Sequence, residues 1–294
     1  MKSKKKLQSG NWLFWVIAGF LILYVLCWLL PFIWGLFASL KDDMELRNNY
    51  FGLPQQWLFS NYQTTLLKMS IKVISASGPK TFYIEQMFLN GFLYAFGRAF
   101  FATITPCIVA YLTTKFSYKF NHVVDVAVLI FLSLPIVGST PSMLQVTRSI
   151  GLYNSMLGMW VLQMTTLNMY YFVFKAACKG ISDSLIEAAK IDGAGNFQIL
   201  FNISLPLLKG TIFTIVLIMF VGNWNDYQNA MLFMPALPTI AYGLYYFNFN
   251  TDNELSSISM KLCGSFVVMT PIIIVFCVFS ARLMNNISLG GVKE

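Results

Sequence analysis

The feature that most constrains the fold of this chain is a series of long runs without charged residues. Each run is close to the roughly 20 residues that an α-helix needs to cross a hydrocarbon core about 30 Å thick. Since lipid offers no hydrogen-bond partners to an exposed backbone, such runs must be helical. The sequence therefore predicts an all-α membrane protein with six transmembrane helices. The runs are residues 12–40, 99–114 (extended outward by 86–97 beyond Arg98), 126–147, 149–174, 210–225 and 262–281.

The composition favours the same class of protein. Of the 294 residues, 57% are hydrophobic and only 11% are charged, whereas about a quarter are charged in a typical soluble domain. The formal net charge is +8, but the basic residues lie at the ends of the apolar runs. We interpret them as signals of membrane topology rather than as a surface for nucleic acid.

The basic residues predict the orientation of the helices. Four lysines precede the first run, and this run is longer than the apolar region of about 7–15 residues in a cleaved signal peptide. We therefore expect an uncleaved first helix and a cytoplasmic basic tail at residues 1–11. Alternation then places the last residues, 285–294, in the cytoplasm as well. The long loop 41–87 is expected outside as short surface structure, and so is the connection within 227–251.

With their flanking residues, the expected spans form one transmembrane domain over residues 12–284. Their bounds are about 12–40, 88–114, 123–147, 151–175, 208–231 and 262–284.

The chain carries little of the chemistry of an enzyme or a metal site. Its single histidine is His122, and its five cysteines fall in or beside apolar runs. No group of these residues has the spacing of metal ligands, and no nucleophile has a histidine nearby in the sequence. The phosphate-binding pattern GxxxxGK[ST] does not occur. We expect no catalytic residue, metal or cofactor on this chain, so any ATP would be hydrolysed by another chain.

The segment between the fourth and fifth runs is the long, polar-interrupted stretch on the predicted cytoplasmic side. Residues 181–210 are ISDSLIEAAKIDGAGNFQILFNISLPLLKG. Ser182 or Ser184 can cap the start of a helix, and Gly193 with Gly195 can end it in a left-handed turn. A short helix followed by a sharp turn is predicted.

One face of this short helix is apolar and carries small side chains. Its acidic residues would be repelled by anionic lipids of the inner leaflet, and its alanines bury little area in a membrane. Docking of the helix into a groove of a soluble partner is therefore favoured over a position on the lipid surface. The face consists of Ile181, Leu185, Ala188 and Ala189.

The same segment carries a resemblance to a known family. EAAKIDGA at 187–194, followed by Ile203 and Leu205–Pro206, resembles the coupling motif of the permeases of binding-protein-dependent ABC importers. NWND at 223–226 and the terminal GGVKE at 290–294 are similar to segments of the carbohydrate, maltose-type branch. The resemblance covers most of the chain, although the loop 41–87 matches only as a type of segment and not through a motif. Gly210 departs from the pattern, because the family often has proline after the LP pair.

The resemblance implies a transmembrane permease subunit of an ATP-driven ABC importer, which takes up a sugar or oligosaccharide by alternating access. It implies a prokaryotic plasma (inner) membrane location, with both termini cytoplasmic. The implied partners are an ABC ATPase dimer that uses ATP and Mg, a second, non-identical permease, and an extracytoplasmic solute-binding protein. That binding protein would contact part of residues 236–260.

The resemblance also assigns roles within the cytoplasmic coupling segment 181–206. Glu187 would offer a charged contact to the ATPase, the alanines would permit close packing, and Gly193 would return the chain to the membrane. The implied coupling residues are Glu187, Ala188, Ala189, Asp192, Gly193, Ala194, Leu205 and Pro206.

Two charges inside the predicted spans need a separate explanation, because ionisable groups in a membrane are costly. Arg98 precedes Lys115 by 17 residues, and Asp226 follows Lys209 by 17. At about 1.5 Å per residue, both lie about 25 Å from their cytoplasmic ends, at a similar outer depth. We hypothesise that they line the external mouth of the translocation cavity, and whether they pair stays open. The alternative is that each side chain extends to the outer interface.

A sugar is bound by planar amides and aromatic faces, and the segment at the outer end of the fifth run supplies both. Aromatic residues also gather at membrane interfaces for reasons unrelated to a solute, so an interfacial role is the alternative. Together with Arg98, the candidate residues of the translocation path are Asn223, Trp224, Asn225, Asp226 and Tyr227.

Other functions stay open at the level of the sequence. The solute could be another polar molecule, such as a polyol or glycerol phosphate, for which Arg98 would be the partner of the anion. From a different class, a partner-independent channel or secondary carrier would need its own pore lining or coupling-ion site. A membrane scaffold is also compatible with the spans, but it gives no reason for the segment 181–210.

Overall fold

The computed structural model describes residues 12–75, 78–134, 138–164, 166–249 and 256–288, without the side chains of Leu13 and of 282–288. The predicted tail 1–11 lies outside the described residues, and so does GGVKE at 290–294. The chain divides into two compact units. The first comprises the chain up to Leu67 with Asn248–Val267, and the second comprises Lys68–Phe247 with the chain from Val268 onward.

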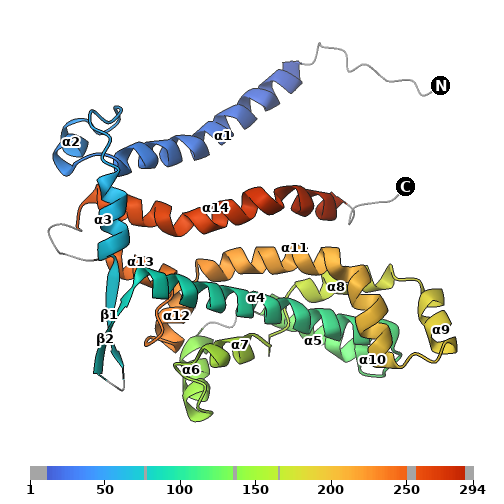
Figure 1. Ribbon diagram of the computed structural model, residues 1–294. Coiled ribbons are helices and arrows are strands. Elements are labelled where there is room, and N and C mark those ends of the chain that lie inside the picture. The colour runs from blue at the N-terminus through green and yellow to red at the C-terminus, as the bar shows by residue number, and fades with distance from the viewer. Residues whose placement is uncertain (1–11, 76–77, 135–137, 165, 250–255, 289–294) are drawn as a thin grey trace. The chain divides into compact units, whose positions relative to one another are not determined.

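The described chain is mostly helical (Figure 1), as expected for an all-α membrane protein. The elements up to the second long helix are α1 (Trp12–Ser39), α2 (Asp43–Asn48), α3 (Ser60–Lys68), β1 (Ser70–Ser75), β2 (Gly78–Tyr83) and α4 (Ile84–Lys115). The middle of the chain contains α5 (Asn121–Ser133), α6 (Ser139–Ser149), α7 (Met156–Met164), α8 (Tyr170–Lys179) and α9 (Asp183–Ile191). The remaining elements are α10 (Asn196–Ile199), the π-helix η1 (Leu200–Ser204), α11 (Leu205–Trp224), α12 (Tyr227–Phe233), α13 (Ile240–Asn248) and α14 (Ile258–Ser288).

In the first unit, α1 is apolar on all sides and most of its side chains are exposed. A helix of this kind is suited to a lipid surround. Polar groups fasten its C-terminal end to α3, because Asn61 donates to the carbonyls of Ser39 and Lys41, each at 3.0 Å. The hydroxyls of Ser39 and Tyr62 are 2.8 Å apart.

The second unit is organised around α4, which packs against α7, α8 and α11. Figure 1 shows α4 and α11 running side by side. α10, η1 and α11 form one continuous helical rod over Asn196–Trp224. A buried apolar cluster lies among α4, α5, α8 and this rod, and its members are Cys107, Ala110, Tyr111, Val128, Tyr171, Phe174, Cys178, Ile181, Leu200, Leu208 and Ile215.

An ion pair connects α5 to α8 within this unit. Asp125 accepts two bonds from the ammonium of Lys175, and the bond to Oδ2 is 2.5 Å long. It also accepts from the hydroxyl of Tyr171 at 2.7 Å. The second oxygen partner of that hydroxyl is Thr113 of α4, at 2.9 Å. The pair therefore fixes a short helix to the helices that surround it.

Among the described residues, four helices are long and apolar enough to cross a membrane. They are Phe14–Ser39, Ile84–Lys115, Asn196–Trp224 and Ile258–Ala281. These helices correspond to the first, second, fifth and sixth predicted spans. The predictions of single continuous helices at 123–147 and 151–175 are wrong, because each stretch is divided between two shorter helices: α5 and α6 in the first, α7 and α8 in the second.

Local backbone chemistry explains both interruptions. α5 ends before Pro135, and Leu134 is extended, with φ −86° and ψ 117°, as proline requires of the preceding residue. Gly138 follows at φ +84°, a conformation that favours glycine. In the second stretch, Oδ1 of Asn168 accepts from the N–H of Tyr170 at 3.0 Å. This side chain competes with the helical hydrogen bonds and sets the start of α8.

The loop 41–87, predicted as short surface structure, contains α2, α3 and an antiparallel hairpin. The strands β1 and β2 pair from Ser70↔Tyr83 to Ser75↔Gly78. β2 continues directly into α4, since Tyr83 is the residue before that helix.

Close packing of α4 on α7 gives a test of this architecture. A Cβ added at Gly97 would collide with the indole of Trp160, whereas one added at Gly222 would meet nothing within 4 Å. We expect Gly97→Ala to lower the stability by about 1–3 kcal/mol. The matched control Gly222→Ala should be neutral or slightly stabilising, because alanine is the better helix former. Thermal unfolding of the purified chain in mild detergent measures both, and equal melting temperatures would contradict the observed packing.

Candidate functional site

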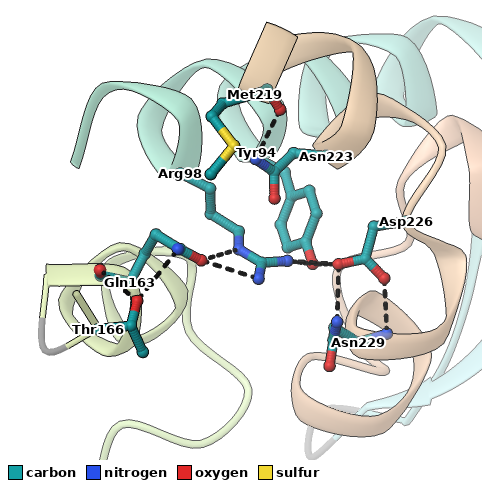
Figure 2. Close-up of polar contacts among 8 residues, drawn as sticks. All are labelled: Tyr94, Arg98, Gln163, Thr166, Met219, Asn223, Asp226 and Asn229. Carbon is teal, nitrogen blue, oxygen red and sulfur yellow. Dashed lines mark hydrogen bonds and ion pairs between the residues drawn. The ribbon is translucent and has the colours of Figure 1, made fainter. Parts of the chain in front are cut away.

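The two charges predicted at the same depth meet in the structure. Figure 2 shows the guanidinium of Arg98, on α4, between Gln163 and Asp226. Nη1 of Arg98 forms an ion pair with Oδ2 of Asp226. The side chains are only 13% and 17% exposed. They bind one another rather than extending to an interface.

Neighbouring polar groups complete this cluster. Tyr94, one helical turn before Arg98, donates to Oδ2 of Asp226 at 2.9 Å and accepts from Nη1 of Arg98. Nε and Nη2 of Arg98 both donate to Oε1 of Gln163, at 3.2 and 3.0 Å. Since Gln163 lies on α7 and Asp226 precedes α12, the cluster joins three segments that are distant in the sequence.

Asp226 is also the N-cap of α12. Its Oδ1 accepts from the backbone N–H of Asn229 at 3.0 Å. Its Oδ2 accepts from the side-chain amide nitrogen of Asn229 at 2.8 Å. A carboxylate is suited to this position, since it accepts from free N–H groups at the start of a helix. The carboxylate therefore serves both the ion pair and the turn between α11 and α12.

The neighbours of Asp226 in the predicted path differ in their surroundings. The amide nitrogens of Asn223 and Asn225 donate back to carbonyls of α11, at 2.7 and 3.0 Å. The indole of Trp224 is 3% exposed and donates to the carbonyl of Val268 at 3.1 Å. Tyr227 stacks on Tyr245 with ring centroids 4.6 Å apart. Of these residues, Asp226 contacts Arg98 directly, whereas Trp224 is part of the packing.

Sequence reasoning missed three members of the cluster, and each carried a signal. Gln163 is a polar residue inside an uncharged apolar run, and such residues usually have a partner. Tyr94 lies four residues before Arg98, so both occupy one face of α4. Asn229 lies three residues after Asp226, the spacing at which a helix cap finds its backbone donor.

The cytoplasmic segment folds into the short helix and turn that its sequence predicts. Ser182 is the N-cap of α9, and its Oγ accepts from the N–H of Ser184 at 3.3 Å. After α9, Gly193 has φ +83°. The N–H of Gly193 bonds to Lys190 at 3.1 Å and that of Ala194 bonds to Ala189 at 2.9 Å. This is the Schellman pattern, in which glycine avoids the strain of a left-handed residue.

The faces of α9 are not equally buried. Ile186 is 8% exposed, so this residue holds the helix against the rest of its unit, and the predicted apolar face did not include it. Leu185 is 49% exposed, and Glu187 and Ala188 are exposed as well. The exposed face contains apolar groups that no described part of this chain covers.

Apolar side chains just beyond α9 extend the exposed surface. Ile191 is 86% exposed and Phe197 is 80% exposed. Of the other implied coupling residues, Asp192 is exposed and Ala194 is half-buried.

Leu205 and Pro206 lie at the start of α11, directly after the π-helix. The N–H of Leu205 bonds to the carbonyl of Leu200, five residues back. Pro206 has no N–H to donate to residue 202, so ordinary helical bonding is interrupted at this point. The wider bonding of η1 accommodates the interruption, and the rod continues.

The buried ion pair predicts a non-additive effect on stability. Arg98→Gln and Asp226→Asn should each destabilise the chain by about 3 kcal/mol, because each leaves one charge without its partner. The double variant removes both charges and should be more stable than either single variant. Melting temperatures in detergent measure all three, and additive losses would contradict direct pairing.

Comparisons with known proteins identify the family of this chain. The family model described as "Binding-protein-dependent transport system inner membrane component" matches residues 102–289. The diacetylchitobiose uptake system permease protein NgcG of Streptomyces coelicolor is 23% identical over 284 residues, with 92% of this chain and 86% of the relative covered. The probable starch degradation products transport system permease protein AmyC of Thermoanaerobacterium thermosulfurigenes is 26% identical over 280 residues, which are 93% of this chain and 94% of the relative.

A solved structure shares the fold. It is the crystal structure of a bacterial ABC transporter involved in the import of the acidic polysaccharide alginate, and one of its chains is 23% identical to this one. The TM-score is 0.75, with 95% of this chain and 99% of that chain covered. Because the family model matches more than half of the chain, this multi-pass membrane protein belongs to the family of binding-protein-dependent transport system inner membrane components.

Proposed function

We propose that this chain is the permease subunit of an ABC importer that takes up a sugar or oligosaccharide by alternating access. The observation that carries the proposal is the full-length similarity to permeases named for diacetylchitobiose and for starch degradation products. The chain would itself hydrolyse no ATP. ATP and Mg would be used by a partner ATPase dimer.

The six-span topology is part of this proposal. α1, α4, the rod Asn196–Trp224 and α14 supply four crossings. The pairs α5–α6 and α7–α8 would supply the other two as broken helices. Breaks at membrane depth are tolerated where protein covers them, and the packing of α7 and α8 on α4 supports this arrangement for the α7–α8 pair. Both termini would then lie in the cytoplasm of a prokaryotic cell.

We assign α9 as the helix that docks on the ATPase. Its exposed face carries Leu185, Glu187 and Ala188, and Ile191 adds a large exposed apolar side chain. Apolar anchors beside a charge are typical of a helix that binds in a groove. The whole segment 181–206 would then form the contact with the ATPase.

The further partners follow from the importer proposal. A second, non-identical permease would complete the membrane domain, and a solute-binding protein would deliver the sugar. Part of residues 236–260 is the proposed contact of this chain with that binding protein.

The charge balance of the Arg98 cluster favours a neutral solute. Asp226 already compensates the guanidinium at Nη1, which also donates to Tyr94, and Gln163 accepts from Nε and Nη2. An anion such as glycerol phosphate would have to displace Asp226, whereas a neutral sugar would not. The same neutrality disfavours a cation-coupled carrier at this site, because the carboxylate has a permanent counter-ion.

Substitutions in α9 and its turn test the coupling proposal. Glu187→Lys reverses a charge at the proposed contact, and Gly193→Pro removes the left-handed turn, since proline is restricted to φ near −65°. Each should reduce co-purification of the ATPase, or its coupling to transport, at least about tenfold. The measurement is mild-detergent purification of the tagged chain expressed with its native neighbours.

Two control variants accompany that experiment. Lys119→Glu reverses a charge on an exposed residue outside α9, and Gly195→Ala alters a glycine with an ordinary φ of −72°. Both should behave as wild type. A wild-type chain that purifies without an ATPase and still conducts solute would contradict the importer and favour a channel or carrier.

Transport assays test the proposed path. Arg98→Ala and Asp226→Ala should each lower uptake severalfold in assembled complexes, because each leaves a charge unpaired beside the proposed mouth. The readout is uptake of radiolabelled oligosaccharides per assembled complex. Wild-type uptake in both variants would remove the pair from the translocation path.

A further inference from the structure

We propose that Lys115 is a positioning residue that fastens the start of α9 to the cytoplasmic end of α4, so that movement of α9 is transmitted along α4 to the Arg98 cluster. The inference rests on the proposed docking of α9 on the ATPase. It adds a second, non-covalent route from α9 into the membrane helices.

The contacts of Lys115 are the first observation. Lys115 is the last residue of α4, and its ammonium donates to the carbonyl of Ile181 at 2.6 Å. It also donates to Oδ1 of Asp183, the first residue of α9, at 2.7 Å. One side chain therefore holds the chain on both sides of Ser182, the N-cap of α9.

The burial of the ammonium makes this attachment persistent. The Lys115 side chain is only 6% exposed, so separation from its partners would leave a charge in a poorly hydrated site. Ile181 is itself buried, in the cluster that contains Tyr111 of α4 and Cys178 of α8. By contrast, the Asp183 side chain is 78% exposed, and an exposed partner contributes little. The carbonyl of Ile181 is therefore the more important of the two contacts.

The helix that carries Lys115 also carries Arg98. The two residues are 17 positions apart, or about 25 Å along a helix. Arg98 binds Asp226, which follows the rod Asn196–Trp224 by two residues. The other end of this rod follows α9 through the turn at Gly193.

These connections form a closed circuit in the second unit. α9 is joined to α4 by Lys115 and to the rod by the chain itself, and Arg98 joins α4 to the far end of the rod. Figure 1 shows α4 and α11 side by side, with α9 beyond one end of them. A displacement of α9 must then move both long helices or break a buried bond.

The test uses the complete complex and a reporter at the far end of the circuit. Gln228 is exposed on α12, close in sequence to Asp226, and is replaced by cysteine. The exposed cysteines Cys27 and Cys277 are replaced by serine, while Cys107, Cys178 and Cys263 are buried. The rate of labelling of Gln228→Cys by a membrane-impermeant maleimide is compared with and without MgATP and vanadate.

In the wild-type complex, we expect the trapped nucleotide state to change the labelling rate. With Lys115→Met, the ATPase should still co-purify, because the docking face of α9 is intact, but the change should shrink at least about fivefold. Lys115→Arg keeps a buried cation with donors and should restore most of it. Asp183→Asn and the exposed control Lys119→Met should resemble wild type.

Several results would overturn the proposal. A wild-type change in labelling with Lys115→Met would show that α4 is not the route. Loss of the ATPase with Lys115→Met would assign Lys115 to the docking surface instead of to transmission. If Lys115→Met does not assemble in the membrane, Lys115→Gln replaces it, with the same expected loss. A wild-type complex without ATPase would instead reject the proposed function itself.

Discussion

The ion pair of Arg98 and Asp226 is the interaction on which the arrangement of the second unit depends. A charge in a membrane helix is tolerated when a partner lies beside it, and here each charge is the partner of the other. The pair fixes α4 against the junction of α11 and α12, and Gln163 adds α7. Since the carboxylate also caps α12, loss of either charge would disturb the turn as well as the helix contact.

Two lysine contacts of the second unit, one partly buried at Lys175 and one buried at Lys115, extend this principle toward the cytoplasmic side. Lys175 binds Asp125 and fixes α5 to α8, while Lys115 binds the chain that leads into α9. Each contact ties a short element to a longer one. The short helices are too short to be stable alone, so their positions depend on such contacts and on the apolar cluster.

The long apolar helices could be predicted from the sequence, because length and hydropathy alone decide whether a helix can cross a membrane. The start and end of α9 could also be predicted from the sequence, because Ser182 and Gly193 act through local backbone chemistry. The divided helices were missed, because counting uncharged residues gives no weight to Pro135 and Gly138 or to Asn168, whose local chemistry favours a helix end or start. The equal depths of Arg98 and Asp226 followed from counting residues, but their pairing required the packing of α4 on α11. Gln163 enters the cluster through α7, whose position no local pattern specifies.

The two connections from α9 to the membrane helices differ in stiffness. The covalent one passes through the turn at Gly193 and then through η1, where the N–H of Leu205 bonds five residues back. A π-helix has less favourable bonding than an α-helix and often occurs at functional positions, so this route contains two points that can deform.

The contact of Lys115 with Ile181 is a single bond from a buried ammonium, followed by the 17 residues of α4 that lead to Arg98. A compliant route beside a stiff one would let α4 and the rod respond unequally to the same displacement of α9. Unequal movement of the two helices is what would strain the ion pair at their far ends.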